Sequence, residues 1–174
     1  MKHGVYVREQ KTSVSTPVVA ESGVPFVVGT APVHSAESPA ALFTPVLCTD
    51  WEDAVKKLGY SDDWKTYTIC EVMYSHFKLF QRQPIIFCNV LDPSTNKEAV
   101  AGAEVTLSGR QAKLPFDAIL SSLVVKTASS SESPLVKDTD YAAYYSDGNL
   151  IVETIEDGAA KAATKLYISY DKIK

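Results

Sequence analysis

The chain has 174 residues and a mass of 19.0 kDa, and 45% of its residues are hydrophobic, which allows one domain or two small ones with a real core. Its formal net charge is -4 and its Lys and Arg residues are scattered, so the sequence argues against nucleic acid as a partner. No apolar run approaches the roughly 18 residues of a membrane-spanning helix and no secretory signal pattern is visible, so we expect no membrane insertion.

The first predicted element is a short β-strand with no partner nearby in the sequence. In the stretch GVYVR the side chains alternate, with Val5 and Val7 on one face and Tyr6 and Arg8 on the other. The fourteen residues that follow are polar and show neither a hairpin turn nor a helical stripe. The pattern predicts an extended N-terminal arm over residues 1–22.

Two apolar runs predict the first strands of an α/β core. Val24 to Val28 form an unbroken apolar run between two glycines, which is typical of a strand buried on both faces. A second short run, at residues 45–48, leads directly into a helix pattern.

The segment TDWEDAVKKLGY carries several helix signals that agree. Thr49 and Glu52 have the spacing of a capping box, and Gly59 is a natural C-cap. An apolar stripe lies between them, made of Trp51, Val55 and Leu58. We expect a helix here.

A longer helix is predicted within residues 61–83, because apolar side chains recur there at three- and four-residue spacing. Pro84 ends it. Ile85 to Leu91 then predict another fully buried strand, closed by the turn signal Asp92-Pro93. Residues 23–93 are therefore expected to form the first part of an α/β core domain.

From residue 94 onward, short alternating segments replace the helical stripes. Strand patterns occur in AEVTLSG, SSLVVKT and KLYISY, and Asp147-Gly148 within YAAYYSDGNLIVETI is the strongest hairpin signal. The Ser-rich stretch at residues 127–134 is expected to be an exposed loop. Residues 94–174 thus predict a small all-β sandwich domain, and the expected fold class is α+β: an extended arm, a partial α/β core layer and a sandwich.

The cysteines and histidines predict neither a disulfide framework nor a metal site. Each cysteine lies in an apolar stretch, which favours buried reduced thiols and folding in a reducing cytoplasm: Cys48, Cys70 and Cys88. The histidines share no spacing with cysteines or carboxylates that is typical of zinc: His3, His34 and His76. For His76, beside the stripe of the long helix, a core-edge position is the favoured interpretation.

No motif predicts catalysis. Asp138 and Asp140 lack the glycine and the glutamate of an EF-hand loop, so a solvated loop is favoured over an ion site. The serines do not form a GxSxG elbow, and the glycines do not form a phosphate-binding loop. We expect no enzyme activity and no cofactor.

Tyrosines are frequent in the predicted sandwich. They are Tyr141, Tyr144, Tyr145, Tyr167 and Tyr170. Cross-strand aromatic pairing that stabilises a small sheet is the favoured interpretation. The alternative is a recognition surface for a carbohydrate or a protein, as in a non-enzymatic, adhesin-like binding module.

Four segments, taken in order, resemble the tail sheath protein of contractile-tailed bacteriophages and related contractile bacteriocins. They are GVYVREQ, TSVSTPVVAESGVPFVVGTAPV, CTDWEDAVKKLGY and SDGNLIVETI with TKLYISYDK. The resemblance implies an N-terminal arm, the first part of an α/β core and an inserted β-sandwich. The later portions of the family have no counterpart here, so we expect a fragment.

The resemblance also implies a function. Sheath subunits polymerise around a tail tube and contract to drive it through a cell envelope, as parts of a virion tail made in the bacterial host cytoplasm. The implied partners are other copies of the subunit and the tail tube protein. On this hypothesis Val5, Tyr6, Val7 and Arg8 add a strand to a neighbour's sheet, and residues 9–21 form the tether.

Overall fold

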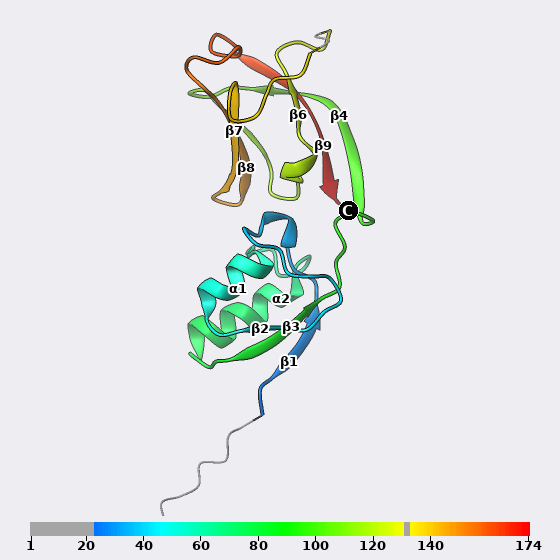
Figure 1. The fold of residues 1–174 in the computed structure, drawn as a ribbon, viewed down its shortest axis with the longest axis vertical. Coiled ribbons are helices and arrows are strands. Elements are labelled where there is room, and N and C mark those ends of the chain that lie inside the picture. The colour runs from blue at the N-terminus through cyan, green and yellow to red at the C-terminus, as the bar shows by residue number, and fades with distance from the viewer. Residues whose placement is uncertain (1–22, 131–132) are drawn as a thin grey trace, which may run out of the picture.

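The computed structural model describes residues 23–130 and 133–174, which contain both helices and sheets, as the α+β prediction requires (Figure 1). The predicted arm, with Val5, Tyr6, Val7 and Arg8, lies outside the described residues. Nine strands in the described part of the chain form three sheets of three strands each.

The first sheet and its helices form the part that we call the α/β layer. Its strands have the order β1-β3-β2, with β1 parallel and β2 antiparallel to the central β3. Their bounds are Phe26–Gly29 for β1, Val46–Cys48 for β2 and Ile85–Asn89 for β3. The helices are the short 3-10 turn η1 (Val33–Ser35), α1 (Trp51–Leu58), α2 (Thr68–Met73) and its π-helical continuation η2 (Tyr74–Leu79).

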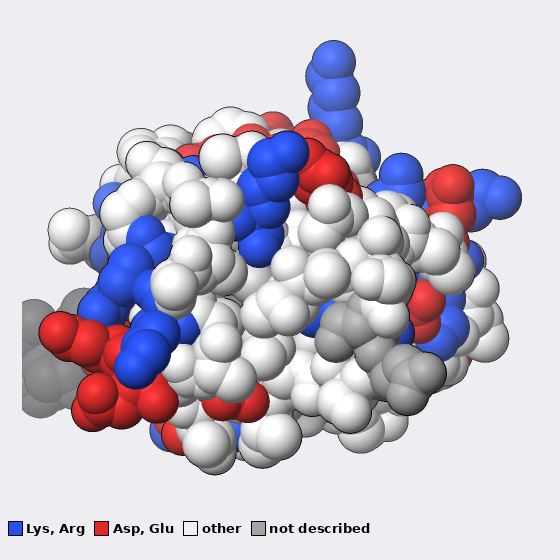
Figure 2. Space-filling view, turned by 90° about the horizontal axis from the view of Figure 1, so that it is seen from above, with Lys and Arg blue, Asp and Glu red and all other residues white. Residues whose placement is uncertain are grey.

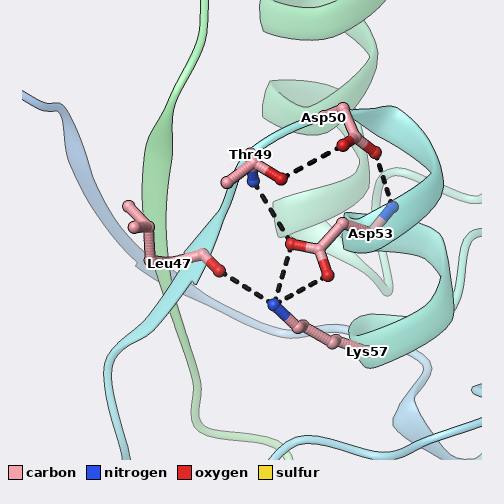
Figure 3. A network of polar contacts seen from close by, with 5 residues as sticks. All are labelled: Leu47, Thr49, Asp50, Asp53 and Lys57. Carbon is pink, nitrogen blue, oxygen red and sulfur yellow. Dashed lines mark hydrogen bonds and ion pairs between the residues drawn. The ribbon is translucent and has the colours of Figure 1, made fainter.

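Helix α1 forms where it is predicted, but its N-terminal cap is one residue later than the predicted Thr49–Glu52 pair. Asp50 is the N-cap, and its Oδ1 accepts a hydrogen bond of 2.8 Å from the Asp53 backbone N–H. In return, Asp53 Oδ2 accepts a bond of 3.2 Å from the Thr49 N–H (Figure 3). The negative charges of the two carboxylates also lie at the positive end of the helix dipole, where they stabilise the helix. This explains why the helix starts after Asp50.

Lys57 ties this cap to the sheet. Its Nζ lies 2.7 Å from the Asp53 carboxylate, four residues earlier on α1, and donates a hydrogen bond of 3.1 Å to the carbonyl oxygen of Leu47 in β2 (Figure 3). At the other end, Gly59 has φ 74° and its N–H donates to Val55 O at 2.8 Å, so the predicted C-cap is confirmed.

The second helix forms within residues 61–83, as predicted, and runs from Thr68 through η2 to Leu79. The preceding residues form turns, in which the Tyr67 N–H donates to Asp63 O. Thr68 is held at the helix start by Thr30, which follows β1: the Thr30 N–H donates to Thr68 Oγ1 at 3.1 Å. A contact between segments this far apart in the chain has no local sequence signal.

Strand β1 is not buried on both faces, which corrects the prediction for Val24 to Val28. Val27 packs against the core, but Val24, Phe26 and Val28 are exposed. The reason is architectural: α1 and α2 lie on one side of the three-stranded sheet, and no described element covers the other side (Figure 1). An unbroken apolar run does not distinguish a covered face from an uncovered one.

We call the uncovered side the open face. The strand register places the outward-facing residues of the three strands next to one another, since Phe26 and Leu47 both pair with Ile86. Alternation continues the same side along β1 and β3, so the open face consists of Val24, Phe26, Val28, Leu47, Ile86 and Val90. Cys88, which pairs with Val28, lies on this side too but is buried. The opposite side carries the core residues Val27, Val46, Cys48, Ile85 and Phe87.

The second half of the described chain forms a β-sandwich of two sheets, with orders β4-β9-β6 and β5-β8-β7. The strands are β4 (Lys97–Thr106), β5 (Gln111–Pro115), β6 (Val124–Lys126), β7 (Tyr141–Ser146), β8 (Asn149–Thr154) and β9 (Lys165–Ile173), with a 3-10 turn η3 (Leu120–Ser122). Inner residues of both sheets share one core, separate from that of the α/β layer. The sandwich is therefore as predicted.

Local turn chemistry fixes the β7–β8 hairpin. Asp147 and Gly148 have φ 48° and 67°, as a two-residue turn of this hand requires, and Ser146 pairs with Asn149 directly across it. The hairpin prediction is confirmed. The described residues of the Ser-rich loop that follows β6 are mostly exposed, as expected.

The first and last strands of the sandwich lie side by side. β4 and β9 pair antiparallel from Lys97 opposite Ile173, and the Lys174 N–H donates to Asn96 O at 3.1 Å. The chain therefore enters and leaves the sandwich at the same end, next to the α/β layer (Figure 1).

Candidate interaction surfaces

The described residues hold no group of three His, Cys, Asp or Glu side chains that could bind a metal ion. Within the same part of the chain, every helix is too short or too polar to cross a bilayer. Cys48, Cys70 and Cys88 are buried and free, as the apolar context predicts, and burial raises the pKa of the Cys48 and Cys70 thiols to about 11. These thiols are protonated at neutral pH and so are poor nucleophiles.

Charged residues of both signs lie near one another on the face of the described chain that Figure 2 shows. The sandwich also carries ion pairs, three of them between the neighbouring strands β4 and β9: Lys97 with Asp171, Lys172 with Glu98, Lys165 with Glu104, and in addition Arg110 with Glu156. A phosphate backbone finds no continuous basic surface on this face.

The five tyrosines of the sandwich do not form one surface. Tyr141 and Tyr170 are buried in the sandwich core. Tyr144 and Tyr167 point outward, and their hydroxyls donate to carboxylates on the paired strands, at 2.8 Å to Glu153 and 2.9 Å to Glu104. The cross-strand partners of Tyr144 and Tyr167 are thus carboxylates and not aromatic rings, so the favoured interpretation is right about stabilisation of the sheets but wrong about aromatic pairing.

Tyr145 belongs to an aromatic cluster between the α/β layer and the sandwich. The ring of His34, in η1, lies 5.8 Å from Tyr145, 5.4 Å from Phe116 and 6.1 Å from Tyr67. We call these four residues the junction cluster. Their edge-to-face and tilted contacts are the kind that aromatic rings prefer.

Two hydrogen bonds hold the junction cluster, the first across the boundary and the second within the sandwich. The Tyr67 hydroxyl donates to Asp117 Oδ1 at 2.9 Å, and the Tyr145 hydroxyl donates to Ala118 O at 2.7 Å. Burial raises the pKa of Tyr145 to about 12, and burial with the bond to Asp117 raises that of Tyr67. Both hydroxyls therefore remain protonated at neutral pH and hold these bonds.

His34 is neutral in this environment. Its Nε2 lies 3.1 Å from the carbonyl oxygen of Phe116, which can only accept, so Nε2 carries the proton. Its Nδ1 is buried and has no hydrogen-bond partner. Burial lowers the pKa of His34, and the bond to Phe116 and the charge of Asp117 oppose this only in part. A proton on Nδ1 would be a buried donor without an acceptor.

Acid is expected to weaken the fold through His34. Below pH 6.5, the ordinary pKa of histidine, the unfolded chain binds a proton at His34 before the folded protein does. The free energy of unfolding then falls with pH, by at most about 1.4 kcal/mol per pH unit, until pH reaches the lowered folded pKa. Denaturant unfolding at several pH values, compared between the wild type and His34→Gln, measures this contribution.

The matched control for this experiment is His76→Gln, since His76 lies outside the junction cluster. His76→Gln keeps His34, so its free energy of unfolding should fall below pH 6.5 as in the wild type, whereas His34→Gln should lack this decrease. Identical pH profiles for the wild type and His34→Gln would contradict the assignment.

Sequence patterns do not predict the junction cluster. The ring partners of His34 lie between 33 and 111 positions further along the chain: they are Tyr67, Phe116 and Tyr145. No sequence pattern links these four residues to one another. The predicted partner-binding residues Val5, Tyr6, Val7 and Arg8 lie outside the described residues, so their role stays a prediction.

Searches against models of protein families, curated protein sequences and solved structures found no match for this chain.

Proposed function

We propose that this chain is part of a structural subunit of a contractile tail sheath, which polymerises around a tail tube in a virion tail. The observation that carries the proposal is the placement of the sandwich. Asn96 and Lys174 lie together beside the α/β layer, and a module whose two ends are adjacent suits insertion into another domain. The resemblance of the sequence to sheath proteins implies this arrangement.

The proposed assembly uses one set of contacts repeated by a screw axis, which gives an open filament. Neighbours must remain linked while the main interfaces slide. A strand at the end of a polar tether provides such a link, because backbone hydrogen bonds hold the strand while the tether absorbs the displacement. In the proposal, Val5 to Arg8 form this strand, and the outer strands β1 and β2 each have an edge that no described strand occupies.

Contraction in this proposal needs no nucleotide and no catalytic residue. The energy is stored in an extended state that a kinetic barrier separates from the contracted one. The partners are other copies of the subunit and the tail tube protein, and the subunit acts as a non-enzymatic protein.

Deletion of residues 2–16 tests the strand link. In the product of the complete gene that contains this sequence, the undeleted protein is expected to form tubes in electron micrographs and large particles in light scattering. The deletion is expected to give neither, because the inter-subunit strand is lost. Ser13→Ala with Ser15→Ala is the control, since it keeps the strand and should keep the tubes. Tubes of normal length from the deletion variant would refute the strand link.

A second candidate is an adhesin-like binding module that uses the exposed Tyr144. The ring is 40% exposed and its hydroxyl is bound to Glu153. Binding to a glycan array that Tyr144→Ala abolishes would favour this candidate over the sheath. Tyr145→Ala is not a clean test, because Tyr145 is part of the junction cluster.

A further inference from the structure

The open face of the α/β layer is apolar from edge to edge. Phe26 is 54% exposed, Val28 57% and Leu47 48%, although each is a side chain that normally lies inside a protein. Ile86 lies between Phe26 and Leu47 in the register and is half-buried by them. The exposed side chains are thus contiguous and not scattered.

The size of the open face is that of an apolar patch that often serves as an interaction site. Its six residues expose on the order of 450 Å² of apolar surface per copy, taking about 150 to 250 Å² for each fully exposed side chain. Contiguous patches of a few hundred Å² or more on soluble proteins usually mark interaction sites. Leaving this area in water would cost on the order of 10 kcal/mol, at about 25 cal/mol per Å².

We propose that two copies of this chain associate through their open faces, with the two three-stranded sheets stacked face to face. The face is suited to pairing with itself, because none of its six residues is charged and a two-fold axis then brings no like charges together. Stacked sheets pack about 10 Å apart, the spacing that apolar side chains of this size fill.

The charge at the rim is already neutralised. Lys57 contacts the carbonyl oxygen of Leu47 at the β2 edge, but its Nζ is also 2.7 Å from the Asp53 carboxylate. The pairing of two copies therefore does not bury an unpaired charge there, which would oppose association.

The buried area sets the strength of the contact. Two open faces remove about 900 Å² from water, just under the roughly 1,200 Å² at which stable interfaces begin, so the dimer is expected to dissociate in the range of about 1 to 100 μM. The inference does not rest on the proposed sheath function, since the open face uses residues between Val24 and Val90 and the proposed strand link uses Val5 to Arg8.

Sedimentation velocity of the whole 174-residue chain, between about 1 and 500 μM, tests the proposal. The wild type is expected to shift from monomer to dimer within this range. Val28→Lys is expected to weaken dimerisation at least tenfold, because it places a charge in the stacked face. Leu47→Lys, on the opposite edge strand, should have the same effect. Thermal unfolding checks that both variants fold.

Val136→Lys is the matched control. Val136 is 59% exposed, almost the same as Val28, but lies in the loop after β6 of the sandwich. It should leave the dimer unchanged. If the loss of dimer were a general effect of an added charge, this variant would lose it too.

Three results would overturn the proposal. One is a wild-type chain that remains monomeric at 500 μM, on the order of five times the weakest expected dissociation constant. Another is a dimer that survives both Val28→Lys and Leu47→Lys, since it would use a different surface. The third is a chain that dimerises only after deletion of residues 2–22, because the arm would then be what covers the open face. Deletion of residues 2–16 should abolish sheath tubes but leave this dimer intact, so the two proposals fail separately.

Discussion

Replacing Gly59 with alanine is expected to lower the free energy of unfolding of the α/β layer by about 3 to 5 kcal/mol. Gly59 has φ 74° and ψ 175°, a region that is essentially restricted to glycine. A Cβ there would also overlap the carbonyl oxygen of Pro32 and would lie 2.5 Å from Ser35 Oγ. The end of α1 and the turn η1 would have to move apart.

Both tryptophans of the chain, Trp51 and Trp64, lie in the α/β layer, so their fluorescence during urea unfolding measures this change. The control is Gly109→Ala. Gly109 also has positive φ, 58°, but an added Cβ there meets nothing within 4 Å. The control should therefore show only the backbone strain, about 1 to 2 kcal/mol, in the unfolding of the sandwich, which far-UV circular dichroism follows. Equal losses for the two variants would show that the contact with Pro32 has no energetic weight.

Replacing Asn89 with leucine is expected to reduce the stability of the same layer by about 2 to 4 kcal/mol. Asn89 is 2% exposed, and its Oδ1 accepts hydrogen bonds from the Ala31 N–H at 2.9 Å and the Leu91 N–H at 3.1 Å. Its Nδ2 donates to Leu91 O at 3.0 Å. Leucine has a similar volume but accepts nothing, so the fully buried Ala31 N–H would lose its partner.

Asn96→Leu is the matched control for this substitution. Asn96 is exposed, and its side-chain bonds to Asp92 O and Thr95 Oγ1 are 3.2 and 3.3 Å long. Water replaces such bonds, so the loss should stay within about 0.5 kcal/mol. Tryptophan fluorescence follows both variants. An Asn89→Leu protein as stable as the wild type would mean that Ala31 finds another acceptor.

The elements that the sequence predicts well are those whose signals are local. The β7–β8 hairpin depends on Asp147-Gly148, and helix α1 depends on its apolar stripe and on Gly59. Each of these signals acts within a few residues. The one-residue error at the N-cap arose because Asp50 and Thr49 are both good caps, and only the contacts of Asp53 distinguish them.

Elements that depend on distant partners were incompletely predicted. Strand β4 extends back to Lys97, although KEAVAG has little strand character, because β9 pairs with it along its length and a bulge lies between Val100 and Ala103. Strand β5, over Gln111–Pro115, has no β-branched residue and was not predicted at all. Pairing with β8 holds it in place.

The distinction between local signals and distant partners also applies to the open face and the junction cluster. The sequence predicts that Phe26 and Val28 belong to a strand, but not that one side of that strand is uncovered, since this depends on which elements pack against it. Asn89 and His34 each bond to a residue more than fifty positions away, Ala31 and Phe116, and these contacts have no local signal in the sequence. Neither position carries a motif.

The adjacent ends of the sandwich have a mechanical consequence. A force that pulled Asn96 and Lys174 apart would act first on the pair Lys97 and Ile173, at the end of the antiparallel β4–β9 ladder. Because the ladder bonds lie across the strands, they would be loaded and broken one pair after another, as in unzipping, and not all together, as in shear. The sandwich should therefore open at low force from this end. A mechanical load on the α/β layer would have to be carried by contacts other than the β4–β9 ladder.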